Sequence, residues 1–111
     1  MKTIVFVNPL KPGKFEEYKN FAAEITGPRK EEFIDLLKRY HLKTSEVWHH
    51  KLGDVEYVIV HHQVEDNVED PLKNWSTSTH PFDQWFQQQL NQLHDMKNVN
   101  SPDLLFSLNI E

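Results

Sequence analysis

Two strand-like runs separated by a tight turn constrain this sequence more than any other feature. Lys43 to Leu52 and Val55 to Val64 are rich in β-branched and aromatic residues, and Gly53-Asp54 lies between them. Such a two-residue connection is typical of a β-hairpin. The sequence therefore predicts two antiparallel strands over these runs.

The turn also predicts which side chains share a face of the hairpin. If Leu52 and Val55 flank the turn, His50 lies opposite Tyr57. Farther along, Trp48 then lies opposite Ile59, and Glu46 opposite His61. Alternate residues of a strand point to the same face, so these side chains form one surface. The other face would carry Val47, His49, Val58, Val60 and His62. A register shift of one residue would change every cross-strand partner.

The sequence before the hairpin predicts one strand and a broken helix. Thr3 to Val7 is a continuous apolar run, as expected of a buried strand. Apolar residues then recur at helical spacing from about 13 to 41. Thr26-Gly27-Pro28 interrupts this pattern, and proline suits the first turn of a second helix. We therefore expect two helical segments.

The sequence after the hairpin predicts a helix and a last strand. Residues 66–77 are polar and contain Pro71, which fits a short helix or an ordered loop. Pro81 opens the clearest helix of the chain. Its broad, mainly apolar stripe consists of Phe82, Trp85, Phe86, Gln89, Leu90, Leu93 and Met96. Leu104 to Ile110 predicts a final strand.

The order of these elements predicts a single α+β domain over residues 1–111. A βαββαβ chain of this length is typical of the ferredoxin-like arrangement, here with a four-stranded antiparallel sheet and an extra broken helix. Helices cover only one face of such a sheet. Trp48, Tyr57 and Ile59 would then form an exposed patch of the size that marks an interface. We expect two copies to bury this patch by packing face to face as a homodimer.

Composition excludes several classes of partner and chemistry. The net charge of −5, without a cluster of Lys and Arg, argues against a nucleic-acid partner. Without cysteine there is no disulfide and no thiolate nucleophile. The apolar run near the N-terminus is too short for a signal peptide or a membrane span. We therefore expect a cytoplasmic protein with no membrane partner.

The predicted open face of the sheet contains the best candidate for a catalytic site. Glu46 beside His61 can orient the imidazole and raise its basicity, so the two residues are candidate acid/base groups. His50, Trp48 and Tyr57 would form the surrounding substrate-binding walls. The alternative is a structural ion pair between the strands, contributing roughly 0.2–1 kcal/mol.

Two further candidates lie near predicted helix ends. His80 could line the mouth of a pocket, held by Asp83, or the two could serve to cap the helix that Pro81 opens. Arg29 follows the helix break, where it could bind an anionic ligand or pair with Glu32. Both alternatives remain open at the level of sequence.

Metal and haem binding are not expected. The doublets His49-His50 and His61-His62 cannot chelate, because adjacent strand residues point to opposite faces. The chain has no His-x-His or His-Glu-x-x-His spacing. On a helical wheel, His94 falls roughly 120° from the centre of the apolar stripe, on its flank or in solvent. We therefore expect no metal ion and no cofactor.

Several short motifs are spread over the chain: Leu10-Lys11-Pro12-Gly13-Lys14, Arg29 with Glu32, Glu46, Tyr57 and His80-Pro81-Phe82-Asp83. Together they resemble a family of small uncharacterised bacterial proteins in the dimeric α/β-barrel superfamily. The superfamily includes antibiotic-biosynthesis-type monooxygenases, haem-degrading enzymes, muconolactone-isomerase-like proteins and sugar mutarotases. The resemblance thus implies the dimeric fold more than one activity.

A more distant similarity connects the chain with rhamnose mutarotases. Glu17-Tyr18 resembles their Glu-Tyr pair on the first helix, but Ala22 stands where their histidine follows one turn later. Mutarotation of rhamnose is therefore not expected.

Two functions remain as hypotheses. One is a cofactor-independent enzyme, isomerase- or monooxygenase-like, acting on a small cyclic organic molecule. The other is a non-catalytic homodimer that binds a small molecule or is purely structural.

Overall fold

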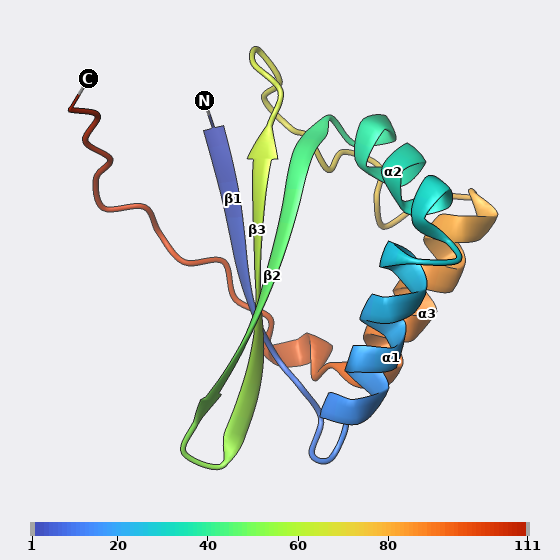
Figure 1. The fold of residues 1–111 in the computed structure, drawn as a ribbon. Coiled ribbons are helices and arrows are strands. Elements are labelled where there is room, and N and C mark those ends of the chain that lie inside the picture. The colour runs from blue at the N-terminus through green and yellow to red at the C-terminus, as the bar shows by residue number, and fades with distance from the viewer. Residues whose placement is uncertain (1, 111) are drawn as a thin grey trace.

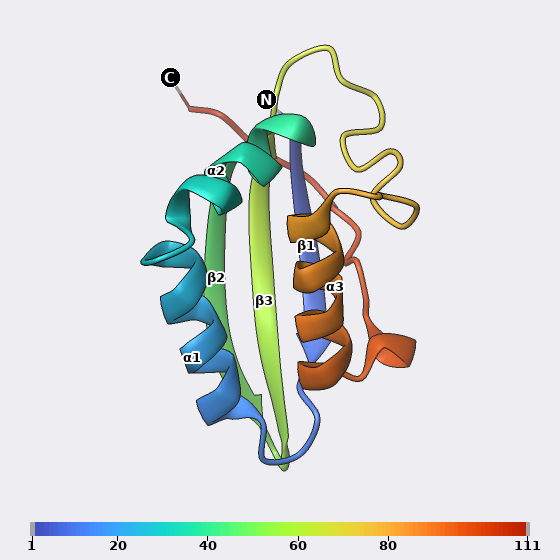
Figure 2. The same ribbon diagram turned by 90° about the vertical axis from the view of Figure 1, so that its right-hand side faces the viewer.

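Three helices cover one face of a three-stranded antiparallel sheet in the computed structural model, which describes residues 2–110 (Figure 1). The elements in chain order are β1 (Lys2–Pro9), α1 (Phe15–Thr26), α2 (Lys30–Arg39), β2 (Leu42–Leu52), β3 (Val55–Val64) and α3 (Pro81–Leu93), followed by a 3-10 helix at Met96–Asn98. The strand order β1-β3-β2 places β3 in the centre. Seen from the helix side, β3 lies between α1 and α3 (Figure 2). The α+β class is thus confirmed.

The predicted hairpin register is confirmed. Leu52 pairs with Val55, Trp48 with Ile59 and Glu46 with His61. Gly53 adopts a φ of +62°, a left-handed conformation that glycine accepts without steric penalty. The only register irregularity between β2 and β3 in the described residues lies between Leu42 and Thr44, far from this turn.

The break between α1 and α2 falls where the sequence predicts it. Pro28 disfavours helical geometry at the residue before it. Gly27 has no side chain, and a Cβ there would lie 2.8 Å from the carbonyl oxygen of Ala23. The tight approach at Gly27 and the ring of Pro28 together end α1 and start α2. α1 buries Tyr18, Phe21 and Ile25 against the rest of the core.

The segment from 65 to 80 forms an ordered loop with turns, one of the two alternatives that the sequence allows. Trp75 packs edge-on against Tyr40 and against Phe86, with ring centroids 5.3 and 5.9 Å apart. These contacts fix the middle of the loop to the helices, so the long connection to α3 does not need a helix of its own.

The expected fourth strand at Leu104 to Ile110 is wrong for the structure that residues 2–110 describe. Asn100 does begin to pair with β1, since it exchanges both backbone hydrogen bonds with Val7, at 2.7 and 3.0 Å. The next such pair would require an N–H at Pro102, which proline lacks. The Ser101 hydroxyl donates to the Val5 carbonyl instead, at 3.0 Å. The chain then leaves the sheet (Figure 1).

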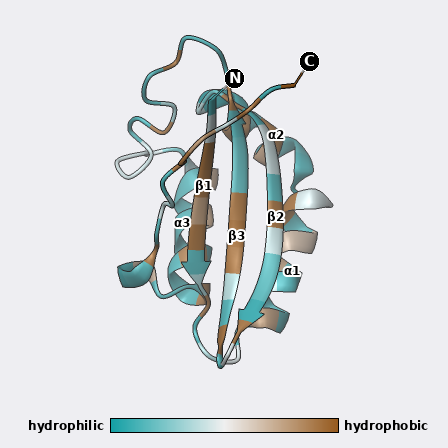
Figure 3. Ribbon diagram, turned by 90° about the vertical axis from the view of Figure 1, so that its left-hand side faces the viewer, coloured by the Kyte–Doolittle hydropathy of each residue, from teal (hydrophilic) through white to brown (hydrophobic). Residues whose placement is uncertain are grey.

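The sheet face without helices, called here the open face, remains uncovered by the described residues. Figure 3 looks onto this face and shows hydrophobic stretches along β1 and the middle of β3. The C-terminal segment, residues 102–110, departs on the same side of the sheet (Figures 1 and 3). The open face and the C-terminal segment thus lie on the same side of the sheet, opposite the helices.

Candidate functional site

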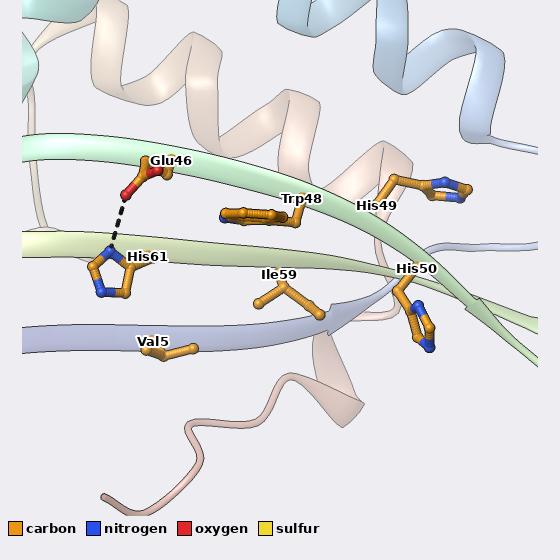
Figure 4. A pocket seen from close by; sticks show the side chains of 7 residues that line it. All are labelled: Val5, Glu46, Trp48, His49, His50, Ile59 and His61. Atoms are coloured by element: carbon orange, nitrogen blue, oxygen red, sulfur yellow. Dashed lines mark ion pairs between the residues drawn. The ribbon is translucent and has the colours of Figure 1, made fainter. Parts of the chain in front are cut away.

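A groove of about 580 Å³ lies on the open face. Its lining residues, which define the open-face groove, are Val5, Glu46, Trp48, His49, His50, Ile59 and His61 (Figure 4). His49 borders the groove from the other face of the sheet, where its ring stacks on Phe15 with centroids 3.7 Å apart. The structure thus brings together four of the residues that the sequence predicts for this site: Glu46, His61, Trp48 and His50. Tyr57 does not line the groove, but it pairs with His50 toward the turn of the hairpin.

Glu46 and His61 form the charged pair of the groove. The carboxylate Oε1 lies 3.6 Å from Nδ1 of the imidazole, as marked in Figure 4. Nδ1 is buried and has no hydrogen-bond partner in the described residues. A small rotation of either side chain would close this distance to a hydrogen bond. The carboxylate would then hold the proton on Nδ1 and leave the other ring nitrogen as a base.

Trp48 forms the apolar wall of the groove. Its indole ring lies beside Ile59 above the sheet (Figure 4) and remains 60% exposed. A large exposed aromatic side chain next to a titratable pair is a surface on which a planar molecule can stack. The arrangement therefore combines a stacking surface with a group that can accept a proton.

The structure places His80 and Arg29 in the helical layer, away from the open-face group. His80 caps α3, because its ring Nδ1 accepts a hydrogen bond of 3.2 Å from the Phe82 backbone N–H. Arg29 donates two hydrogen bonds to the Glu32 carboxylate, at 2.9 and 3.0 Å. Both residues thus have structural partners, in agreement with the structural alternatives left open by the sequence.

Arg29 also lies over two aromatic rings. Its guanidinium carbon is 4.1 Å from the centroid of the Trp85 ring and 4.8 Å from that of Phe82. The hydrogen bond with Glu32 raises the pKa of Arg29 and lowers that of Glu32. Arg29 therefore joins the start of α2 to α3 by stacking, while its charge is paired with Glu32 of α2 itself.

Asp83 is the centre of a buried hydrogen-bond network. The hydroxyls of Tyr40 and Ser78 donate to it at 2.6 and 2.7 Å, and Arg39 forms an ion pair with it. Burial raises the pKa of Asp83, but the hydrogen bonds from Tyr40 and Ser78 and the charge of Arg39 outweigh it and lower the pKa below its ordinary value. Since every oxygen is satisfied, this carboxylate stabilises the fold.

A second cavity, of about 310 Å³, lies between the sheet and the helices and escaped the sequence analysis. Asn8 of β1, His62 of β3, Trp75 of the loop and His94 at the end of α3 contribute its nitrogen-bearing side chains. The strand register already places His62 on the helix-facing side, which is the one signal that could have revealed this site. The sequence offers no comparable signal for Asn8.

The expected exposure of His94 is wrong. α3 ends at Leu93, and His94 adopts an extended backbone with φ −111° and ψ 152°. A helical wheel therefore does not apply to it, and its side chain turns inward to become 1% exposed. Its Nδ1 lies 3.3 Å from the Pro9 carbonyl oxygen, which ties the end of α3 to the end of β1.

No protein-family model matches the sequence, and no curated protein is significantly similar to it. Within residues 2–110, no three His, Asp or Glu side chains gather into a site for a metal ion. No helix in this range combines the length and the apolar character required to span a bilayer. The open-face groove and the second cavity are therefore the features of the molecule that bear on its function.

Proposed function

We propose that the protein is a homodimer of ferredoxin-like domains that binds a small cyclic organic molecule between its two open sheet faces, where His61 and Glu46 transfer a proton. One observation carries the proposal. The helices leave uncovered the sheet face on which a Glu–His pair and an exposed Trp48 line one groove. Stacking and proton transfer are the two actions that these groups support.

The apolar surface outside the core supports a dimer. The C-terminal segment exposes side chains that a folded chain ordinarily buries: Leu104 at 75%, Leu105 at 91%, Phe106 at 81%, Leu108 at 78% and Ile110 at 90%. The segment departs on the side of the sheet that the helices leave open (Figure 1), and Trp48 is 60% exposed on that side. Exposed apolar side chains in this number favour a protein interface.

A second copy of the chain is the partner that fits both surfaces. Pro102 stops the segment from extending its pairing with β1 of its own sheet. The outer edge of β2 carries no strand in the described residues, so its N–H and C=O groups can pair with an extended segment from a partner. In a two-fold dimer each copy supplies the same face and the same segment, so both contacts form twice.

Dimerisation would also complete the chemical environment of the groove. A second sheet over the groove excludes water, which strengthens the interaction between Glu46 and an imidazolium at His61. The imidazole would take a proton from a ring carbon and return it to another atom of the same ring, while Glu46 stabilises the charge. This isomerisation needs no oxidant. A monooxygenase-like reaction would begin with the same proton removal and take dioxygen as its oxidant.

The oligomeric state tests the dimer directly. Light scattering and sedimentation should give a dimer for the full chain and a monomer for Trp48→Glu, which places a charge in the interface. Gln88→Glu adds the same charge on the exposed side of α3 and should stay dimeric. A chain that ends at Ser101 should form a weaker dimer, which dissociates at a higher protein concentration than the dimer of the full chain. A full chain that is monomeric at about 100 μM, where specific interfaces form, would contradict the proposal.

Proton transfer is tested by isotope exchange. Cyclohexanone in deuterium oxide should exchange its ring protons beside the carbonyl faster with the protein than in buffer, as followed by NMR. His61→Gln should reduce this catalysed rate by about 10²-fold or more, the scale of general-base catalysis. Equal rates for the two proteins would remove the role assigned to His61.

The second candidate function is a non-catalytic homodimer. The position of Trp48 favours it, because the indole occupies the groove side of the sheet and could fill the space between two packed sheets (Figure 4). This candidate predicts the same response of the oligomeric state to Trp48→Glu, but no catalysed exchange with any cyclic ketone. The exchange experiment thus separates the two functions.

A further inference from the structure

The cavity between the sheet and the helices has the lining of a site for an uncharged molecule. It is more enclosed than the open-face groove, and its volume of about 310 Å³ is at the lower end of the range for small-molecule sites. Most of its lining is aromatic or aliphatic, and no described Lys, Arg, Asp or Glu side chain contributes to it. A charged ligand would lose its hydration there without gaining a counter-ion.

Two polar atoms in this lining are buried without a partner. Asn8 Oδ1 and His94 Nε2 are inaccessible to solvent and have no hydrogen-bond partner in the described residues. Native proteins rarely leave such atoms unsatisfied, because they lose their hydrogen bonds to water without replacement. Both residues line the cavity, so a molecule that enters it and shifts these side chains slightly can supply the missing partners.

The hydrogen bonds of the two cavity histidines determine what that molecule must offer. The Pro9 carbonyl can only accept, so His94 carries its proton on Nδ1 and presents a lone pair at Nε2. The same holds for His62, whose Nδ1 donates to the Thr44 carbonyl at 3.1 Å. Burial lowers the pKa of both histidines, which keeps them neutral. Asn8, His62 and His94 therefore present acceptors, which favour a ligand with hydrogen-bond donors, while Tyr18, Ser45 and Trp75 of the lining carry groups that can donate.

Aromatic rings form the apolar part of the site. Phe21 meets Phe86 edge-on with centroids 5.1 Å apart, and Phe33 stacks on Phe86 at 5.7 Å. All three rings line the cavity. Flat aromatic molecules pack well against such edges and faces.

We infer that this cavity is a binding site for a neutral aromatic molecule that carries a hydroxyl group, separate from the open-face groove. The hydroxyl would donate to Asn8 or His94 at the end of the cavity near Pro9. His62 pairs with Ile4, four residues along β1 from Asn8, which is roughly 13 Å at the usual rise of a strand. The site thus suits a ligand of one or two rings with a donor at one end or at both.

Naphthol is the probe for this site, with naphthalene and naphthoate as matched controls. Calorimetry on the full chain should show naphthol binding about fivefold or more tightly than naphthalene, the contribution of one hydrogen bond. Naphthoate should not bind measurably, because its charge finds no partner. Asn8→Leu and His94→Leu should each weaken naphthol binding while leaving naphthalene binding within about twofold.

Filling the cavity tests its location. Val60→Phe and Ser45→Leu each add volume to a lining residue and should abolish naphthol binding. The two variants are independent, so one remains informative if the other fails to fold by circular dichroism. Trp48→Glu alters only the open face and should keep naphthol binding even when the dimer dissociates. Loss of this site and loss of the proposed dimer function are therefore distinguishable.

Three results would overturn the inference. The first is no binding of naphthol up to about 1 mM, where fragment-sized ligands bind measurably. The second is equal affinity for naphthol and naphthalene, which would mean that the acceptors take no part. The third is unchanged naphthol binding in a folded Val60→Phe or Ser45→Leu protein, which would place the ligand elsewhere.

Discussion

The two faces of the sheet place the same kind of residue in different surroundings, as the neighbours His61 and His62 show. His61 faces the open groove beside Glu46, whereas His62 faces the helices and is held neutral by burial. Strand alternation alone separates them, because adjacent side chains point to opposite faces. A histidine doublet in a strand therefore supplies one group to a solvent-facing site and another to the protein interior, without any further element of structure.

The carboxylates on the two sides of the molecule show the same contrast in packing. Asp83 lies on the helix side, is fully buried and binds three neighbours, whereas the Glu46 side chain is 60% exposed and has one partner at 3.6 Å. A buried, satisfied carboxylate stabilises its surroundings, but an exposed one remains free to react. Changes to these groups should therefore affect the free energy of unfolding to different extents, most at Asp83 and least at Glu46.

The largest effect is expected for Asp83→Ala. Removing the carboxylate leaves the buried hydroxyl of Tyr40 and the part-buried hydroxyl of Ser78 without their acceptor, and Arg39 keeps only its ion pair with Asp35, so urea unfolding should show a loss of about 3 kcal/mol. Asp83→Asn preserves the shape and should lose less. A loss below about 1 kcal/mol for the alanine variant would mean that the Asp83 network contributes no more than an exposed ion pair does. The difference between Asp83 and Glu46 would then disappear.

An intermediate effect is expected from acidification. The pKa values of His62 and His94 are lowered in the folded chain, so the unfolded chain takes up protons more readily as the pH falls through 6.5. The free energy of unfolding should therefore decrease from about pH 7.5 to about pH 5.5. Urea titrations across this range provide the measurement.

Variants separate the contribution of the interior histidines from that of the open face. His62→Leu and His94→Leu should each flatten the pH dependence, because each removes one group that titrates only after unfolding. His50→Gln on the open face serves as the matched control and should retain most of the slope. If the stability of the wild-type protein stays constant or rises on acidification, His62 and His94 are not held neutral in the folded chain.

The smallest effect on stability is expected for Glu46→Gln. The pair with His61 is partly exposed and longer than a hydrogen bond, so the free energy of unfolding should change by less than about 1 kcal/mol. The catalysed exchange of cyclohexanone should fall in the same variant. A large loss of stability with unchanged exchange would reverse the roles assigned to the two faces.

The hairpin register and the open-face group could be predicted from sequence because both depend on local rules. Gly53 fixes the turn, and alternation then determines the neighbours of Glu46 and Trp48 without knowledge of the rest of the fold. The helix break at Gly27-Pro28 is local in the same sense. The pairing of Arg29 with Glu32, three residues apart, also lies within reach of sequence reasoning.

The missed features depend on contacts between distant residues. Pro102 ends the pairing with β1 only because Asn100 meets Val7, a register that no local pattern specifies. His94 is buried because α3 ends one residue earlier, and a helical wheel cannot locate that end. The second cavity depends on how far large rings such as Phe21 and Phe86 hold the helices from the sheet, which follows from packing and not from periodicity.

The departure of the C-terminal segment from the sheet has a consequence for the handling of the protein. Residues 104–110 form a mainly apolar run without charge, proline or glycine, and such a composition is typical of segments that seed amyloid-like strand stacking. In the single chain, the apolar side chains of this run are exposed. Asp103 precedes the run and Glu111 follows it in the sequence, and charges in these positions oppose such stacking. Conditions that keep the segment unpaired, such as high dilution followed by concentration, should therefore favour fibrils over recovery of the native protein.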